Sequence, residues 1–253
     1  MINNLKKTYY ELQEYLKQSI NEPSKLDTFG SQKGQIDFLI NNVYNYEKNG
    51  LPYGKYFIDL AAGDGIKFSN TYYLEKYLDW EGLLIEPNPN FKKSLNENRI
   101  SKKVFDCIGP NNKDTVSFRV DNGMLAGIVG DDFDNNVKNR EEELKSAEII
   151  KLNTVRLEDV LLENNSPNHI DYLSLDVEGA EEFVLDTFNF NKYSFGFITI
   201  ERPTNKLNIT LEKNGYIQVK NLKTETFYVP RERLGDLNLN PKIRFQNTSK
   251  KIW

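Results

Sequence analysis

Cysteine and histidine are almost absent from this chain, which has one of each, Cys107 and His169, among 253 residues. A single cysteine excludes an intramolecular disulfide and any zinc site that needs several cysteines, and it suits a reducing compartment such as the cytoplasm. His169 stands at the start of a strand-like segment, opposite to the expected site. We therefore expect it to have a structural role.

Long apolar runs and an excess of basic charge are also missing. Hydrophobic residues make up 38% of the chain and charged residues 28%, and no apolar run reaches the ~20 residues of a membrane-spanning helix. Residues 1–20 carry no signal-peptide core. The net charge of -4 disfavours nucleic acid as a partner, because a sequence-independent grip needs a basic face to neutralise phosphates. These observations predict a soluble, cytoplasmic protein without a membrane span.

No linker rich in proline, glycine or serine divides the chain. We expect a helical extension or lid at residues 1–50, one α/β domain at 51–230, and a tail at 231–253 that packs on the domain or is partly ordered. Residues 2–20 place apolar side chains at helical spacings of three and four. This spacing predicts a helix that packs on the domain or on a second copy of the chain. A homo-oligomer is therefore one of the two alternatives.

Strand-like and helix-like segments alternate along most of the chain. Strands are predicted at 56–60, 82–86, 103–108, 115–120, 170–175, 195–200, 216–220 and 226–229, and helices at 35–48, 66–78 and 89–97. This alternation predicts an α/β fold with a mostly parallel sheet, whose last strand pairs antiparallel. Such a sheet is typical of the Rossmann-like, class I methyltransferases that use S-adenosylmethionine (SAM). The polar stretch 121–150 predicts a mobile loop over the site.

A short apolar strand runs into a glycine-rich turn between Phe57 and Gly65, which predicts a nucleotide-type cofactor site. The side chains from Ala61 to Gly65 are small or short, so backbone amides can approach a ligand closely. Gly63 and Gly65 can adopt a positive φ at little cost. A helix that began near Ile66 would direct its positive N-terminal end at the ligand.

The next strand ends at Glu86, roughly 20 residues beyond this turn, where an acidic side chain commonly binds ribose hydroxyls. A dinucleotide fingerprint needs a third glycine at position 68, but the chain has Phe68, which disfavours NAD. SAM has no pyrophosphate and favours one carboxylate near its ammonium group and another near its ribose. Asp59 or Asp64 could supply the first and Glu86 the second, so SAM fits better. Asp64 could equally cap a helix.

Five motifs carry a family resemblance. They are Phe57-Ile58-Asp59-Leu60-Ala61-Ala62-Gly63-Asp64-Gly65, Ser69-Asn70-Thr71, Leu84-Ile85-Glu86-Pro87, Thr154-Val155-Arg156-Leu157-Glu158-Asp159 and Leu175-Asp176-Val177-Glu178-Gly179-Ala180-Glu181. With these motifs the chain resembles the FkbM family of SAM-dependent O-methyltransferases over about residues 30–230. We place Ala61, Gly63, Gly65, Asn70 and Pro87 among the cofactor-binding residues. The resemblance implies methylation of a hydroxyl, often on a sugar or polyketide, in glycan or natural-product pathways.

Methyl transfer to a hydroxyl requires close positioning of the acceptor and either a base or a metal ion. Asp176 follows the buried strand 170–175, where open α/β sheets place ligands, and is our first candidate for the base as well as a cofactor neighbour. Glu178 and Glu201 would complete a three-carboxylate cluster with Asp176 that could hold Mg²⁺. Alternatively, Glu178 caps a helix and Glu201 pairs with Arg202.

Four further residues are candidates for the cofactor site. Asp106 follows the third strand, where its carboxylate could accept the adenine amino hydrogen while the Cys107 amide donates to the ring. A simple turn at the strand end is the alternative for Asp106. Gln35 and Asp37 could belong to a polar lid over the cofactor or to an ordinary helix start.

The leading hypothesis is a SAM-dependent O-methyltransferase that acts on a sugar, a glycan or a small metabolite. An RNA ribose 2′-O-methyltransferase is the alternative within methyl transfer, but no lysine is evident on the helix after Asp176. An N6-adenine methyltransferase would need a Pro-Pro-aromatic motif where Val177-Glu178-Gly179 stands. An NAD-dependent sugar oxidoreductase is disfavoured by Phe68, and a non-catalytic, SAM-sensing role by Asp59, Glu86 and Asp176.

Overall fold

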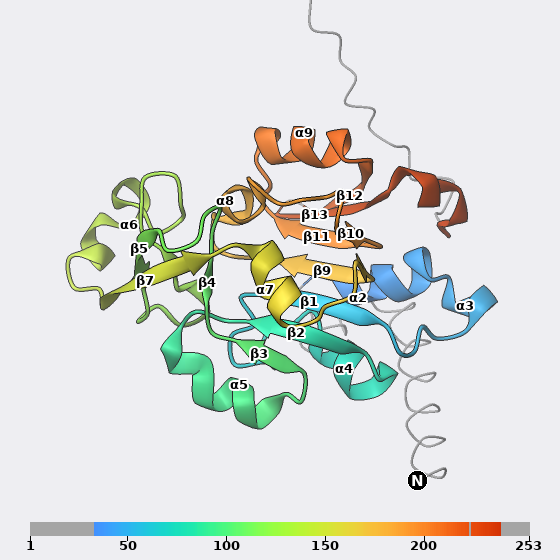
Figure 1. The fold of residues 1–253 in the computed structure, drawn as a ribbon, viewed down its shortest axis with the longest axis horizontal. Helices are drawn as coiled ribbons and strands as arrows, with labels where there is room; N and C mark the ends of the chain where they lie inside the picture. The colour runs from blue at the N-terminus through green and yellow to red at the C-terminus, as the bar shows by residue number, and fades with distance from the viewer. Residues whose placement is uncertain (1–32, 223, 239–253) are drawn as a thin grey trace, which may run out of the picture.

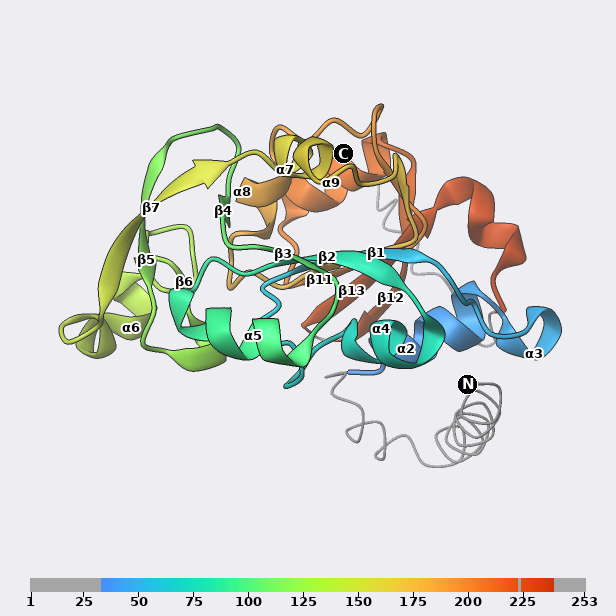
Figure 2. The ribbon, with the colours of Figure 1, turned by 60° about the horizontal axis from the view of Figure 1, so that its bottom comes forward.

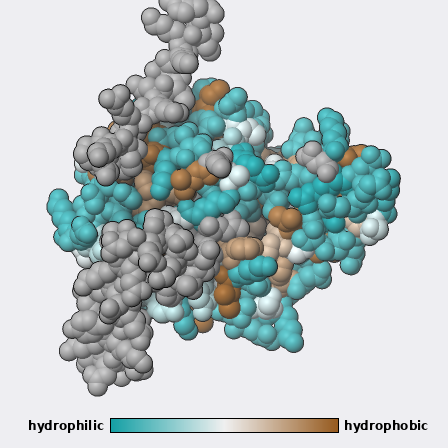
Figure 3. All heavy atoms as spheres, turned by 180° about the vertical axis from the view of Figure 1, so that it is seen from behind, coloured by the Kyte–Doolittle hydropathy of each residue, from teal (hydrophilic) through white to brown (hydrophobic). Residues whose placement is uncertain are grey.

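The computed structural model describes residues 33–222 and 224–238 as a central sheet between two helical layers, with a smaller sheet at one end (Figure 1). The predicted helix at 2–20 and the tail beyond residue 238 lie outside the described residues. Within the described ranges, no helix combines the length and the apolar character that crossing a membrane requires. Seen from behind, the described surface is mainly hydrophilic with small apolar patches (Figure 3).

Seven strands form the central sheet in the order β12-β13-β11-β9-β1-β2-β3. Their bounds are β1 Tyr56–Leu60, β2 Glu81–Ile85, β3 Lys102–Val104, β9 Tyr172–Leu175, β11 Ile198–Glu201, β12 Tyr216–Leu222 and β13 Glu225–Pro230. All neighbouring pairs are parallel except those of β13, which runs antiparallel to both β11 and β12. The predicted Rossmann-like methyltransferase sheet, including its antiparallel last strand, is confirmed.

Side chains on successive positions of β1 point to opposite faces of the sheet, and each face is covered by helices. Ile58 and Leu60 pack with α7 (Leu157–Glu163), α8 (Glu181–Leu185) and α9 (Asn205–Lys213). Phe57 packs on the other face with α2 (Gln35–Phe38), the π-helix η2 (Leu39–Val43), α4 (Tyr72–Leu78) and α5 (Lys92–Asn98). Figure 2 shows these two helical layers above and below the sheet.

A second sheet, in the order β4-β7-β5-β6, lies beyond the ends toward which β9 and β11 point (Figure 1). Its strands are β4 Cys107–Ile108, β5 Thr115–Arg119, β6 Gly127–Ile128 and β7 Ile149–Val155, and η4 (Gly123–Leu125) and α6 (Val137–Leu144) accompany them. The prediction of a loop throughout 121–150 is therefore wrong. Apolar side chains such as Phe118 and Ile128 pack with Ala180 of the main domain, which gives the segment a small core of its own.

Three predicted strands are each divided in the structure. Residues 103–108 separate into β3 and β4, which belong to different sheets, because the chain leaves the central sheet at Phe105 and Asp106. The segments 170–175 and 195–200 likewise begin with short strands, β8 (His169–Ile170) and β10 (Ser194–Phe195), which pair only with each other. The central sheet continues with β9 and β11.

Two predicted helices also differ. The segment 35–48 is divided into α2, η2 and α3 (Tyr46–Asn49), and Asn45 has a positive φ of 49° before α3. The predicted helix at 66–78 begins only at Tyr72, in α4. The preceding loop is held by Arg99, whose guanidinium donates to the Gly65 carbonyl and the Ser69 hydroxyl. Consequently, no helix N-terminus lies directly after Gly65. The predicted helix at 89–97 is present as the 3₁₀ turn η3 (Pro89–Phe91) followed by α5.

Candidate functional site

Two pockets adjoin one another at the carboxyl ends of the parallel strands. The apolar pocket lies between β1, β2 and the second sheet and includes Ile85, Glu86, Ile108 and Ile128. The acidic pocket is lined by Asp59, Phe68, Ser174, Asp176 and Glu178 among others. Leu60, Ala61 and Met124 line both pockets. One ligand with an apolar and a charged part could therefore extend through both.

Glu86 is the buried carboxylate of the apolar pocket. Its Oε2 accepts a hydrogen bond of 2.8 Å from the Gly63 amide and its Oε1 one of 2.8 Å from the Asn88 amide. Burial raises the pKa of Glu86 to about 7. The two hydrogen bonds lower this pKa, and the charge of the nearby Asp59 raises it. Pro87 follows and lines the same pocket, as predicted for the cofactor-binding set. Each Glu86 oxygen retains a lone pair for a ribose hydroxyl.

The turn after β1 brings the backbone close to Met124. Gly63 has a φ of 55°, and a Cβ built on it would lie 2.4 Å from Met124 Cε. Ala61 also has a positive φ, 66°, which a non-glycine residue adopts only at a cost of about 1–2 kcal/mol. Gly65 instead packs against Arg99 and Leu95 and lines neither pocket. Within the predicted turn, Ala61 and Gly63 are therefore the residues whose backbone can approach a ligand closely.

Of the two aspartates considered near the ammonium group, Asp59 lies in the acidic pocket and Asp64 in neither pocket. Asp64 Oδ1 accepts hydrogen bonds from the amides of Ile66 and Lys67, so it stabilises the turn. It does not cap a helix, which was the alternative interpretation, because α4 begins only at Tyr72. Asp59 Oδ2 accepts a bond of 2.5 Å from the Thr71 hydroxyl. Burial raises the pKa of Asp59, while this hydrogen bond and the charge of Arg99 lower it.

Asn70, Asp106 and Cys107 reach the pockets, whereas the two lid residues do not. Asn70 lines the acidic pocket and donates to the Ser174 hydroxyl at 3.2 Å. Asp106 is exposed and Cys107 is buried in β4, and both line the apolar pocket. Burial, with the charges of Asp106 and Glu86, raises the pKa of the Cys107 thiol to about 12.

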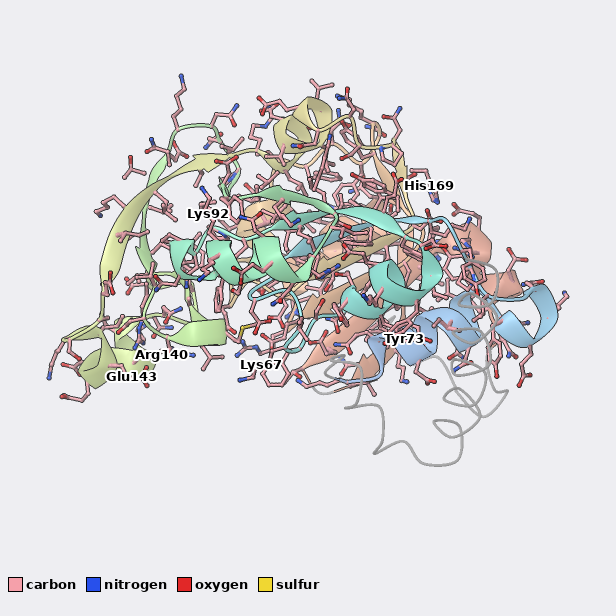
Figure 4. The ribbon with its side chains drawn as sticks, turned by 90° about the horizontal axis from the view of Figure 1, so that it is seen from below. Lys67, Tyr73, Lys92, Arg140, Glu143 and His169 are labelled. Carbon is pink, nitrogen blue, oxygen red and sulfur yellow. The ribbon has the colours of Figure 1, made fainter. Side chains whose placement is uncertain are left out.

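Gln35 and Asp37 lie outside both pockets, on or near α2. Gln35 forms a hydrogen bond with Glu225, and Asp37 accepts a bond of 2.5 Å from Asn41. The structure thus brings neither to a pocket wall. His169 is exposed, forms a hydrogen bond with Ser194 and lines neither pocket. Figure 4 shows it far from Arg140 and Glu143 of α6.

The three predicted catalytic carboxylates belong to two overlapping groups. Asp134, Glu178 and Glu201 form the outer triad, and Asp176, Glu201 and Glu225 form the inner triad; in each, the three oxygens lie within 4.8 Å of one another. Asp176 and Glu178 line the acidic pocket. The predicted trio is thus split, because Glu178 associates with Asp134 and Asp176 with Glu225.

Arg202 neutralises the outer triad. Its Nη2 donates to Asp134 and to Glu201 Oε2, the latter at 2.6 Å, and lies 3.9 Å from Glu178 Oε2. The alternative pairing of Glu201 with Arg202 is therefore present, and Glu201 is shared between this pair and the inner triad. The three carboxylates around it raise the pKa of Arg202 despite its partial burial.

Mutual repulsion and burial shape the electrostatics of the cluster. Burial, with the charges of Glu201 and Glu225, raises the pKa of Asp176 well above its usual range. Burial and Glu201 raise the pKa values of Glu178 and Glu225 to about 7. A group of acids in this state can bind cationic ligands or accept protons near neutral pH.

Sequence reasoning missed four residues at this site: Arg99, Met124, Asp134 and Glu225. Asp134 and Met124 fall in the stretch interpreted as a loop, and nothing local distinguishes them. Arg99 is 2% exposed, and its guanidinium lies 2.9 Å from Glu75 Oε1. The signal that could have found Glu225 is its place directly before the predicted strand 226–229, which the structure extends to β13, Glu225–Pro230.

Comparison with protein families agrees with a methyl-transfer site. A model of the methyltransferase FkbM domain matches residues 59–217. No curated protein matches the chain. Among solved structures, the chain is similar to the precorrin-6y C5,15-methyltransferase from Geobacter metallireducens GS-15, with 12% identity, a TM-score of 0.38, and coverage of 81% of this chain and 93% of that chain.

Proposed function

This chain belongs to the FkbM methyltransferase family, and we propose that it transfers the methyl group of SAM to a hydroxyl of a sugar, glycan or small metabolite. The observation that carries the proposal is the pair of adjoining pockets with a common wall of Leu60, Ala61 and Met124. SAM has an apolar nucleoside end and a charged amino-acid end. An apolar pocket beside an acidic pocket matches these two ends.

The residues present fit SAM. Ile85, Phe91 and Ile108 offer apolar contacts to an adenine ring, and Glu86 offers a carboxylate to the ribose hydroxyls. Asp59 offers a buried carboxylate on the side of the amino-acid end. When bound, SAM supplies a methyl group activated by its attachment to a sulfonium. The protein binds and orients it, and the absence of a side chain at Gly63 makes room for Met124, which lines both pockets.

Asp176 is the residue we assign to the acceptor hydroxyl. It follows β9, lines the acidic pocket, and its Oδ1 has no hydrogen-bond partner among the described residues. As the acceptor oxygen forms its bond to the methyl carbon and the sulfur–carbon bond breaks, Asp176 takes the hydroxyl proton. The products are the methyl ether and S-adenosylhomocysteine.

Phe68 supports an acceptor with an extended face, such as a sugar ring. Its side chain is 46% exposed, lines the acidic pocket and has a φ of 61°, a strained conformation for an aromatic residue. Leu125, 47% exposed, lines the same pocket. An exposed ring at a pocket mouth presents a surface on which the apolar face of a sugar can stack.

The test combines binding and turnover. Calorimetric titration with S-adenosylhomocysteine and, separately, with NAD distinguishes a methyltransferase from an oxidoreductase, and micromolar binding of S-adenosylhomocysteine alone is expected. Transfer of an isotope-labelled methyl group from SAM to a panel of monosaccharides and oligosaccharides then tests the acceptor class. Binding of NAD alone would contradict the proposal, and labelling of RNA instead of sugars would reassign the acceptor.

A further inference from the structure

We propose that the inner triad, Asp176, Glu201 and Glu225, binds one divalent cation of the Mg²⁺ or Mn²⁺ class beside the acidic pocket. The inference rests on the proposed function for its chemical role, because the cation would lie next to the acceptor hydroxyl. The proposed set of metal ligands differs from the set expected from the sequence, because Glu225 takes the place of Glu178.

The sheet register forces these three side chains together. Glu201 of β11 is directly opposite Glu225 of β13. Leu175 of β9 is aligned with Ile200 of β11, so Asp176 and Glu201 occupy the next position along these parallel strands. Like charges directly opposite in a sheet are destabilising. A positive partner at the centre of these three acids would relieve this repulsion.

Among the described residues, the nearby positive side chains form an ion pair with only one acid of the inner triad, Glu201. Arg202 directs Nη2 at Glu201 and Asp134, which belongs to the outer triad. Lys33 lowers the pKa of Glu225 through its charge, but its Nζ donates to the Thr224 hydroxyl. Within residues 33–222 and 224–238, no ion pair involves Asp176 or Glu225. Neither of these two carboxylates is therefore neutralised by an ion pair within the described residues.

Two acids of this triad each have a buried carboxylate oxygen without a hydrogen-bond partner in the described part of the chain. Glu225 is 2% exposed, and its Oε1 has no hydrogen-bond partner in the described part of the chain; the same holds for Asp176 Oδ1. A buried carboxylate oxygen without a donor costs free energy unless a ligand meets it. Both oxygens belong to residues whose carboxylates lie within 4.8 Å of each other and of Glu201, a spacing that admits one ion between them.

The donor set selects the type of cation. Three carboxylates offer only hard oxygen ligands, which suit Mg²⁺, Mn²⁺ or Ca²⁺ rather than softer metals. Asp176 also lines the acidic pocket, so a cation on the triad would be within reach of an acceptor hydroxyl. It would stabilise the alkoxide that develops as the proton leaves. Mg²⁺ commonly combines a few protein carboxylates with oxygens of water or substrate.

The experiment titrates the full chain with MnCl₂ and measures free Mn²⁺ by electron paramagnetic resonance. The expected result is one Mn²⁺ per chain, displaced by Mg²⁺, and a rise in Kd of about tenfold or more in Glu225→Gln. Glu181→Gln is the matched control, because Glu181 is 3% exposed and has a pKa raised to about 7, but it belongs to neither triad. The amide oxygen of the substituted side chain could still accept the bonds from the Val177 and Gly179 amides, so this variant should bind Mn²⁺ within about twofold of the wild type.

Absence of stoichiometric Mn²⁺ binding, or equal weakening by Glu225→Gln and Glu181→Gln, would overturn the cation site. Circular dichroism monitors folding, and Asp176→Asn serves as the second ligand variant if Glu225→Gln does not fold. Parallel titration with S-adenosylhomocysteine separates the two proposals. Binding of S-adenosylhomocysteine without binding of Mn²⁺ would refute only the cation site. Binding of Mn²⁺ without binding of S-adenosylhomocysteine would refute the proposed methyl transfer but not the cation site.

Discussion

The carboxylate of Glu86 accepts a hydrogen bond of 2.8 Å from the amide of Gly63, 23 positions earlier in the chain. The bond joins the turn after β1 to the end of β2, the two segments that form one wall of the apolar pocket. The acid expected to bind ribose thus also holds the glycine turn. Removing its charge should affect both the turn and the ligand.

Cofactor affinity should depend on pH through Glu86. Burial raises its pKa to about 7 in the folded protein, so below pH 7 most Glu86 carboxyl groups are protonated. This proton must leave before the carboxylate can accept hydrogen bonds from the ribose hydroxyls. Binding of S-adenosylhomocysteine should therefore release a proton below pH 7, and its Kd should fall as the pH rises from 6 to 8 and then level off. Calorimetry in buffers of different ionisation enthalpy measures this release.

The Glu86→Gln variant should bind S-adenosylhomocysteine more weakly and with a flatter pH profile. Glu181→Gln is its control, because the Glu181 pKa is also raised to about 7 but Glu181 lines neither pocket. The same linkage applies to folding. Because the folded pKa is raised above the unfolded value of 4.5, the contribution of Glu86 to stability is present below pH 4.5 and lost as the pH rises through 7. An unchanged pH profile in Glu86→Gln would contradict the assignment.

Gly63→Ala should weaken binding of S-adenosylhomocysteine by about tenfold or more, whereas Gly54→Ala should not. The two glycines have similar φ values, 55° and 64°, so both substitutions incur similar backbone strain, but Gly54 lines neither pocket. Only at Gly63 does the new Cβ meet another group, Met124, in the wall shared by the pockets. Equal losses of affinity in both variants would show that strain alone is responsible.

Asp176→Asn should reduce the rate of methyl transfer by about 10²- to 10⁴-fold, because the amide cannot accept the hydroxyl proton. The Kd of S-adenosylhomocysteine should change much less, since the cofactor has other contacts in both pockets. Single-turnover kinetics with labelled SAM, beside calorimetry, separate these effects. Loss of cofactor binding with retained turnover would reverse the assigned role.

Phe68→Ala should raise the KM for a sugar acceptor by about tenfold and leave the affinity for S-adenosylhomocysteine nearly unchanged. Ile66→Ala is the control, because Ile66 is 41% exposed on the same loop but lines neither pocket. Steady-state kinetics with the best acceptor from the labelling panel provide the measurement. A similar change of KM in both variants would point to a general effect on the loop.

Arg99→Leu should lower the free energy of unfolding by about 3–5 kcal/mol, because it leaves the buried Glu75 without its ion-pair partner and the loop after Gly65 without three hydrogen bonds. Lys93→Leu on α5 is the comparison. Its ion pair with Glu97 is exposed and 4.0 Å long, so it contributes at most about 0.5 kcal/mol. Urea unfolding curves measure both, and similar losses would refute a structural role of the Arg99 network.

Much of the central sheet could be predicted from local patterns. The apolar segments around β1, β2 and β9 and the close spacing of β12 and β13 predicted a parallel sheet with an antiparallel end, and these strands are present. The glycine turn and Glu86 could also be located, because a strand, a turn and an acid at a fixed distance are features of neighbouring residues. Local backbone preference and alternating burial are properties that each short segment carries by itself.

The tertiary structure determined which side chains lie opposite one another. The start of α4 at Tyr72 depends on Arg99, which is distant in sequence and holds the preceding loop open. Glu225 faces Glu201 only because β13 inserts between β11 and β12. Glu178 associates with Asp134 because the segment between β6 and α6 packs on the turn after β9, where the Asp134 amide donates to the Glu178 carbonyl. Sheet register and loop packing set distances between side chains far apart in the chain. The sequence therefore determined the family and the sheet, whereas the grouping of the carboxylates required the fold.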